Sequence, residues 1–213
     1  AGAPAPGGAA GLDGQPPREA ENGQIHSPPL NATQVLMMDP AKGTLQHIGE
    51  PLGVGGGSCT EGVPGQAGPD SDTWWGMAAG DNGKLYCPPC NSLRVLVIDP
   101  ATDSVYKIGP YFAGDGKWGG AAKAPNGKLY SPPRMARRVL CIDPRNESVT
   151  EIGQFFDEGG DKWSSITLAE DGKFYCTPRG AKSVLVIDPQ RDESWEAPAD
   201  CGAGGQWQHM AAA

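Results

Sequence analysis

The phrase NGKLYCPPC occupies residues 82–90, and the chain repeats it almost unchanged as NGKLYSPPR at residues 126–134. Two weaker copies, NGQIHSPP at 22–29 and DGKFYCTP at 171–178, complete a series of four. The later copies recur every 44 or 45 residues, and a constant period of this length indicates a repeat architecture. An apolar run that ends in Asp-Pro follows each copy, at residues 35–40, 95–100, 139–144 and 184–189.

Each repeat reads as four short strands. NGK and DGK are turn sequences in which glycine supplies a positive φ. The segment KLYCP alternates as a strand does, and RVLVID is a continuous β-branched run that is typical of a strand covered on both faces. Proline ends that strand because it cannot donate a backbone hydrogen bond. With WGMAA in front and SVYKIG behind, the unit is a blade of an all-β, four-stranded antiparallel β-propeller.

The repeats define the layout of the chain. Residues 1–20, rich in proline and glycine, form a flexible N-terminal tail, and residues 21–213 form the propeller. Blade 1 comprises 21–49 and lacks a tryptophan strand of its own. WQHMAAA, at 207–213, is expected to fill that gap beside Ile25 and close a ring of four blades. The alternative is that the chain forms part of a six- or seven-bladed ring. The other blades are 74–109, after an insert at 54–73, then 118–153 and 163–198.

Composition excludes several classes of protein. The net charge of −8 disfavours nucleic-acid binding, and no apolar run reaches the roughly 18 residues that a membrane span needs. Cys87 and Cys90 lack the second CxxC or His pair of a structural zinc site, so no metal or other cofactor is predicted. Two glycosylation sequons, at Asn31 and Asn146, favour a lumenal or extracellular protein.

Residues 118–153, WGGAAKAPNGKLYSPPRMARRVLCIDPRNESVTEIG, carry a resemblance. The unit is similar to the repeats of the virginiamycin B lyase, NHL and gluconolactonase group of propellers. It resembles even more closely the NGKxY…VLxIDP repeat proteins of dinoflagellates and other microalgae. The resemblance covers residues 21–213 and implies the propeller fold. It also makes a lactonase-like or lyase-like enzyme, with a divalent metal on the ring axis, an alternative function.

No catalytic residue is predicted. The expected axial strands contain no Asp or Glu, and His209, where other blades have Met77, Gly120 and Ser165, has no evident group to orient it. Cys141 is expected to be a buried core thiol. In each repeat an aspartate precedes the proline that ends the third strand, and we expect its carboxylate to cap its own turn. The alternative is that the four aspartates form a ring of metal ligands. These residues are Asp39, Asp99, Asp143 and Asp188.

Three tryptophans stand ahead of the repeated phrase: Trp75, Trp118 and Trp163. We expect them to wedge between blades, and stacking on a sugar is the alternative. Two sets of loops are expected on one face of the propeller, where they would bring arginines and aromatic rings together as an interface does. The predicted partner-binding residues are Arg134, Arg137, Arg138, Arg179, Tyr111, Phe112, Phe155 and Phe156.

The sequence therefore predicts a non-catalytic propeller that binds a protein partner through this loop face. It would act as a scaffold and would be an accessory subunit of a larger algal complex. One setting for such a subunit is peripheral association with a membrane complex. A lactonase-like or lyase-like enzyme and an extracellular carbohydrate-binding module are the alternatives.

Overall fold

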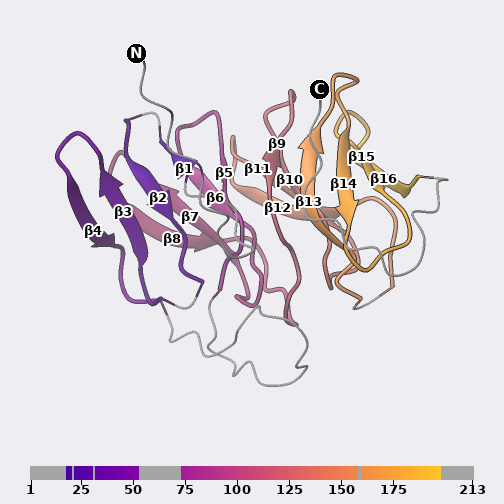
Figure 1. Cartoon of the computed structure of the whole chain (residues 1–213), viewed down its shortest axis with the longest axis horizontal. Coiled ribbons are helices and arrows are strands. Elements are labelled where there is room, and N and C mark those ends of the chain that lie inside the picture. The colour runs from indigo at the N-terminus through magenta and orange to yellow at the C-terminus, as the bar shows by residue number, and fades with distance from the viewer. Residues whose placement is uncertain (1–17, 21, 31, 53–72, 158–159, 198–213) are drawn as a thin grey trace, which may run out of the picture.

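The computed structural model describes residues 18–20, 22–30, 32–52, 73–157 and 160–197 (Figure 1). These residues form sixteen strands, and none of them is helical, so no helix in the described part is long and apolar enough to cross a membrane. The strands are β1 (Arg18–Glu19), β2 (Ile25–Ser27), β3 (Val35–Asp39), β4 (Thr44–Ile48), β5 (Ala78–Ala79), β6 (Leu85–Cys87), β7 (Val95–Asp99), β8 (Ser104–Ile108), β9 (Ala122–Lys123), β10 (Leu129–Ser131), β11 (Val139–Asp143), β12 (Ser148–Ile152), β13 (Trp163–Leu168), β14 (Phe174–Pro178), β15 (Leu185–Asp188) and β16 (Glu193–Glu196).

The strands form four separate four-stranded sheets, each a simple antiparallel meander: β1–β4, β5–β8, β9–β12 and β13–β16. We refer to them as blades 1 to 4 in chain order. The first strands of blades 2, 3 and 4 lie next to one another, and the later strands of each blade lie further out (Figure 1). The described residues therefore have the all-β architecture of a β-propeller with four four-stranded antiparallel blades, and this predicted fold class is confirmed.

The repeated phrase folds as predicted. In blade 3, Gly127 has a φ of +80° in the hairpin between β9 and β10. The side chain of Asn126 accepts a hydrogen bond from the backbone N–H of Lys128 at 3.0 Å and so holds this turn. Tyr130 and Leu129 follow in β10, fully or nearly fully buried on opposite faces of the blade. The phrase recurs because every blade needs this turn followed by a strand that is covered on both faces.

The four Asp-Pro carboxylates cap their own turns. Asp39 accepts from the backbone N–H of Lys42 at 3.1 Å, and Asp188 accepts from that of Gln190 at 2.9 Å. Asp99 and Asp143 accept from the residue two positions further on, at 3.0 and 3.1 Å. The expectation of turn caps is confirmed, because these oxygens face local backbone donors.

The core lies between blades. Trp118 packs with Tyr86 and Val97 of blade 2 and with Leu140 of its own blade in one apolar cluster. Trp163 occupies the same position between blades 3 and 4. In blade 2 this position belongs to Trp74, so the expectation that Trp75 is the third wedge is wrong. Each wedge donates its indole N–H to a backbone carbonyl twenty residues on, at 2.8–2.9 Å.

Blade 1 differs from the expected layout at its first strand. Arg18 pairs with His26 and Glu19 pairs with Ile25, so two residues that we had assigned to the tail form β1. They occupy the place beside Ile25 that we expected 207–213 to fill. Residues 207–213 lie outside the described part of the chain. Among the described residues, β1 is therefore the inner strand of blade 1, and it precedes β2 in the sequence.

Candidate binding face

The two predicted loop sets do meet on one face. The loops after β6, β10 and β14 lie against the segments that precede Trp74, Trp118 and Trp163. Backbone hydrogen bonds of 2.8–3.1 Å connect them in a continuous series that runs from blade 2 to blade 4. In order, each residue accepting from the next, the series is Thr73, Cys90, Lys117, Arg134, Lys162 and Arg179. This belt of hydrogen bonds makes the face a rigid base for its side chains.

Two of the predicted arginines lie in an ion-pair network. The Nε of Arg134 is 2.6 Å from one carboxylate oxygen of Asp161, and the Nε of Arg179 is 3.0 Å from the other. The guanidinium of Arg134 also stacks over the ring of Trp75, 4.4 Å from its centroid. Only 5% of the Arg134 side chain is exposed. Asp161 therefore bridges blades 3 and 4, and Arg134 stabilises the face from below.

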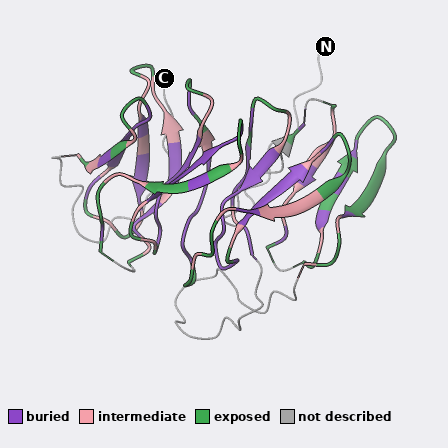
Figure 2. Ribbon diagram, turned by 180° about the vertical axis from the view of Figure 1, so that it is seen from behind, coloured by how far each residue is buried: buried purple, intermediate pink, exposed green. Residues whose placement is uncertain are grey.

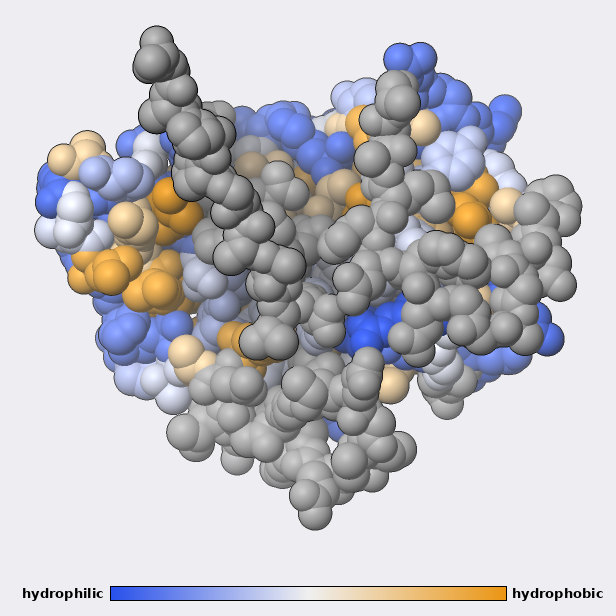
Figure 3. Space-filling model, in the orientation of Figure 1, coloured by the Kyte–Doolittle hydropathy of each residue, from blue (hydrophilic) through white to orange (hydrophobic). Residues whose placement is uncertain are grey.

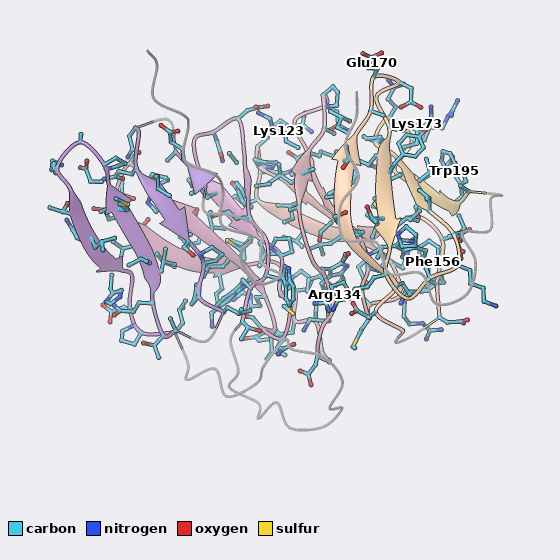
Figure 4. The ribbon with its side chains drawn as sticks, in the orientation of Figure 1. Lys123, Arg134, Phe156, Glu170, Lys173 and Trp195 are labelled. Atoms are coloured by element: carbon cyan, nitrogen blue, oxygen red, sulfur yellow. The ribbon has the colours of Figure 1, made fainter. Side chains whose placement is uncertain are left out.

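Two of the predicted aromatic residues belong to the core. Phe112 meets Trp118 edge to face with ring centroids 4.8 Å apart, and Phe156 meets Trp163 in the same way at the same distance. Phe156 is only 6% exposed. These rings pack against the wedges and so hold their own loops in place. Phe156 and Arg134 lie toward the same end of the molecule (Figure 4).

The other two aromatic residues are exposed. Tyr111 is 75% and Phe155 is 69% exposed, and the two occupy equivalent positions in blades 2 and 3. The guanidinium of Arg94 lies 5.6 Å from the centroid of Tyr111, and that of Arg138 lies 4.7 Å from the centroid of Phe155. Arg137 is also near Phe155, at 5.9 Å. Cation–π contact of this kind holds an exposed ring in place without burying it.

Arg94 and Arg138 make equivalent hydrogen bonds in their own blades. The Nε of each donates to the carbonyl of the glycine that ends the fourth strand, Gly109 at 3.0 Å and Gly153 at 3.1 Å. Leu93 and Met135, 39% and 40% exposed, flank the arginines on the same loops. We call the set of Leu93, Arg94, Tyr111, Met135, Arg137, Arg138 and Phe155 the loop surface. The predicted partner-binding residues do not include Arg94, although its place before Val95 matches that of Arg138 before Val139.

Around the axis the inner segments approach too closely to leave room for side chains. A Cβ added to Gly76 would lie 2.8 Å from the carbonyl oxygen of Gly119, and one added to Gly119 would lie 2.9 Å from that of Ser164. The Ser165 hydroxyl donates to the Thr177 hydroxyl at 2.7 Å. The described residues contain no group of three or more His, Cys, Asp or Glu that could hold a metal ion. His209 lies outside them.

Four cysteines of the described part are buried and form no disulfide with one another: Cys87, Cys90, Cys141 and Cys176. Burial raises the pKa of the Cys141 thiol to about 11, and it raises the pKa values of Cys87 and Cys176 further still. Because the thiolate is the reactive form, these groups are poor nucleophiles at neutral pH. The expectation that Cys141 is a core thiol is confirmed.

Comparison with known proteins identifies the fold. No protein-family profile and no curated protein matches the sequence. Virginiamycin B lyase from Staphylococcus aureus superposes with a TM-score of 0.62 at 12% identity, over 87% of this chain and 56% of the lyase. Hydrazine synthase from Kuenenia stuttgartiensis superposes with a TM-score of 0.59 at 16% identity, over 91% of this chain and 52% of that one.

A further neighbour is the extracellular domain assigned to a one-component system of B. thetaiotaomicron. Its TM-score is 0.56 at 12% identity, over 90% of this chain and 24% of that one. The chain thus spans about half the length of the lyase and of hydrazine synthase. At such low identity the likeness shows the β-propeller fold and does not extend to activity.

Proposed function

We propose that the protein is a non-catalytic binding module that holds a protein partner on its loop surface. The observation that carries this proposal is the repetition of Tyr111 and Phe155 in consecutive blades, each largely exposed and each beside an arginine. Exposed apolar side chains that gather on one surface mark interaction sites, and aromatic residues with arginine are enriched where interfaces are strongest.

The chemistry of the surface indicates the kind of segment it would bind. Tyr111, Phe155, Leu93 and Met135 offer apolar contact area, while the neighbouring guanidinium groups offer donors for carboxylates. The belt of backbone hydrogen bonds beneath holds the loops in place, which lowers the entropic cost of binding. The partner segment would therefore combine apolar and acidic side chains.

Within this proposal the protein is an accessory or scaffold subunit of a larger assembly. The resemblance of the NGKxY…VLxIDP repeats to microalgal proteins supports an algal assembly. The exposed Asn146 of an Asn-Glu-Ser sequon, in the turn after β11, supports a lumenal or extracellular compartment. Peripheral association with a membrane complex is one setting in which such a subunit would work.

The test is capture of partners from extract of the source cells, with quantitative mass spectrometry as the readout. The double variant Tyr111→Ala/Phe155→Ala removes both anchors, and Arg137→Glu reverses an exposed charge beside them. Each should reduce recovery of a specific partner at least about tenfold, since interface anchors contribute more than about 1.4 kcal/mol. Partner recovery equal to that of the unmodified protein would refute the proposal.

Arg191→Glu is the matched control. Arg191 is 70% exposed, pairs with Asp188, and lies in the turn between β15 and β16, away from the loop surface. It undergoes the same charge change as Arg137→Glu, so recovery should stay at the unmodified level. An equal loss in both variants would show a response to net charge alone. Binding of the unmodified protein to a glycan array, abolished by the double variant, would assign the same rings to carbohydrate.

A further inference from the structure

Blade 1 exposes an apolar face that the other blades bury. Leu36 and Met38 of β3 are each 40% exposed, and Leu45 of β4 is 64% exposed. Their equivalents in blade 2, Leu96 and Ile98, are fully buried. Figure 2 shows exposure along β4, and Figure 3 shows apolar side chains gathered over β3 and β4. We call Leu36, Met38 and Leu45 the blade-1 face. It lies on a different part of the molecule from the loop surface.

In later blades these positions form the contact with the preceding blade. Leu96 and Ile98 pack with Val35 and Met37 of blade 1 in a single cluster. Leu140 and Ile142 pack with the corresponding valines of blade 2, and Leu185 and Ile187 pack with blade 3. Each blade thus presents the first and third residues of its apolar run before Asp-Pro to the second and fourth residues of that run in the next blade. Leu36 and Met38 of the blade-1 face occupy the positions that in blades 2 to 4 pack against the preceding blade.

The fourth strand of each later blade also contacts the preceding blade, and this contact requires a glycine. Val105 of blade 2 sits against Gly49 of blade 1, so closely that a Cβ on the glycine would lie 2.6 Å away. Val149 sits in the same way against Gly109. The residue of blade 1 at this position is Leu45. A fitting occupant therefore carries a glycine after its fourth strand, opposite Leu45.

A polar contact joins each pair of blades at the hairpin end. The side-chain amide of Asn82 donates to the carbonyl of Pro144 in blade 3 at 2.9 Å, and that of Asn126 donates to Pro189 at 2.7 Å. Asn22 donates to Pro100 in the same way at 3.1 Å. The equivalent residue of blade 1 is Pro40. The occupant would therefore present an asparagine in its hairpin turn.

Blade 4 does not have the matching chemistry. Asp171 replaces the asparagine, and its carboxylate accepts from the Tyr175 hydroxyl at 3.0 Å instead of donating to another blade. In blades 2 and 3 the lysine two positions after the asparagine pairs with an acid of the following blade, Lys84 with Glu147 at 2.8 Å and Lys128 with Asp192 at 2.6 Å. Blade 1 has Gly43 in place of that acid. Blade 4 of this chain, or of a second copy, therefore lacks the donor that the blade-1 face requires.

From these contacts we propose that the blade-1 face binds a further propeller blade of the same repeat type, which is none of blades 1 to 4. That blade would present small β-branched residues from its third strand, an asparagine in its hairpin turn and a glycine after its fourth strand. It would extend the series of blades beyond Leu36 and Leu45.

The first experiment supplies such a blade. A copy of residues 74–117 is fused ahead of residue 14 of the full chain, so that the linker reproduces that between blades 2 and 3. Hydrogen exchange of the peptide 35–48 should slow at least about tenfold, because the added blade buries three apolar side chains and closes local opening. Exchange of β7 and β11 should not change, which shows that the parent blades remain folded. Unchanged exchange of 35–48 in a protein with intact β7 and β11 would overturn the proposal.

A matched chimera carries Leu36→Glu and Met38→Glu. It should lose the added protection of 35–48, while protection of β7 and β11 stays as in the parent. Equal protection in both chimeras would show that the added segment protects the strand without contacting this face, which also contradicts the proposal.

The second experiment identifies the source of the occupant. Leu45 is replaced by a photo-crosslinking phenylalanine derivative in the full chain, and the crosslinked peptides are sequenced after irradiation in extract of the source cells. Crosslinks should fall in a repeat with NGK and Asp-Pro sequences that lies outside residues 1–213. Crosslinks to blade 4 of this protein, to a second copy, or to a protein without such repeats would overturn the assignment.

Discussion

His26 should make the stability of the protein fall as the pH drops from 7 to 5. It is fully buried in β2, and neither ring nitrogen makes a hydrogen bond of good geometry with the residues that the structure describes. Blades 2 and 3 have Tyr86 and Tyr130 at this position. Burial lowers the pKa of His26, and the carboxylate of Asp103 and the nearby backbone of Gln24 oppose that shift only in part. The protonated ring is therefore disfavoured in the folded state.

The sign follows from proton binding. Below about pH 6.5 the unfolded histidine is protonated while the folded one is not, so the unfolded state binds more protons. Unfolding becomes easier by up to about 1.4 kcal/mol per pH unit until the lowered pKa of the folded state is reached. Above the ordinary pKa both states are neutral, and the contribution of His26 does not vary with pH.

The substitution His26→Tyr should remove this dependence and raise the stability at neutral pH. In blade 3 the Tyr130 hydroxyl accepts from Asn126 at 3.1 Å and donates to Asp192 at 2.8 Å. Asn22 and Asp103 are the equivalents around His26. An unsatisfied buried polar group costs about 1–3 kcal/mol, and crowding of the larger ring against Met37 takes back part of the gain. The companion change Met37→Val, the residue of blade 2, relieves that crowding.

For the double variant we expect a net gain of about 2 kcal/mol at pH 7, or roughly 4–8 °C in Tm for a chain of this size. Calorimetry from pH 7.5 to 5.0 on the unmodified protein and both variants measures it. The difference between the Tm curves of the three proteins isolates the contribution of His26, because His47 is unchanged in all of them. Parallel Tm curves over this pH range would refute the assignment of the acid sensitivity to His26.

Three further outcomes are expected. Gly109→Ala should cost about 2 kcal/mol or more in denaturant unfolding, because φ is +80° and the new Cβ would lie 2.8 Å from a valine of the next blade. Gly172→Ala, with φ +78° and open space around it, should cost less, and equal losses would contradict the contact. Arg134→Glu should destabilise by about 3–5 kcal/mol and Arg137→Glu by no more than about 0.5, measured in the same way. Cys141 should react with a thiol reagent at pH 8 only as fast as the protein unfolds, and fast labelling of folded protein would contradict its burial.

The sequence was sufficient for the blades because their signals are local. The glycine of the NGK turn, the β-branched run and the Asp-Pro stop act within a few residues, so their period reveals the four sheets. Trp74 and Trp75 are adjacent, and only packing between blades decides which of them becomes the wedge. The pairing of Glu19 with Ile25 escaped prediction for the same reason, since two residues carry too weak a pattern to mark a strand.

The sequence predicted which loops form the binding face, but it did not predict which of their side chains are buried and which are exposed. Arg134 and Arg137 are three residues apart in one loop, yet one is buried against Asp161 and Trp75 and the other lies beside exposed Phe155. Phe155 and Phe156 are neighbours with opposite exposures. Composition brings such residues to the same loop, and the direction of each side chain depends on contacts from the next blade. Consecutive residues in an extended segment point to opposite sides, which is why adjacent rings separate into anchor and core.

Departures from the repeat carry the functional information in this fold. The asparagine of the hairpin turn, which blades 1, 2 and 3 share, forms a contact between blades and says little about partners. Asp171 replaces that asparagine in blade 4, Gly43 replaces in blade 1 the acid that pairs with the hairpin lysine of the preceding blade, and Leu45 is exposed where Val149 is buried. A repeat protein whose end blades were sealed against water would be expected to carry polar residues there. The apolar blade-1 face therefore argues for a neighbour at that end, just as the exposed rings of Tyr111 and Phe155 argue for a partner on the loops.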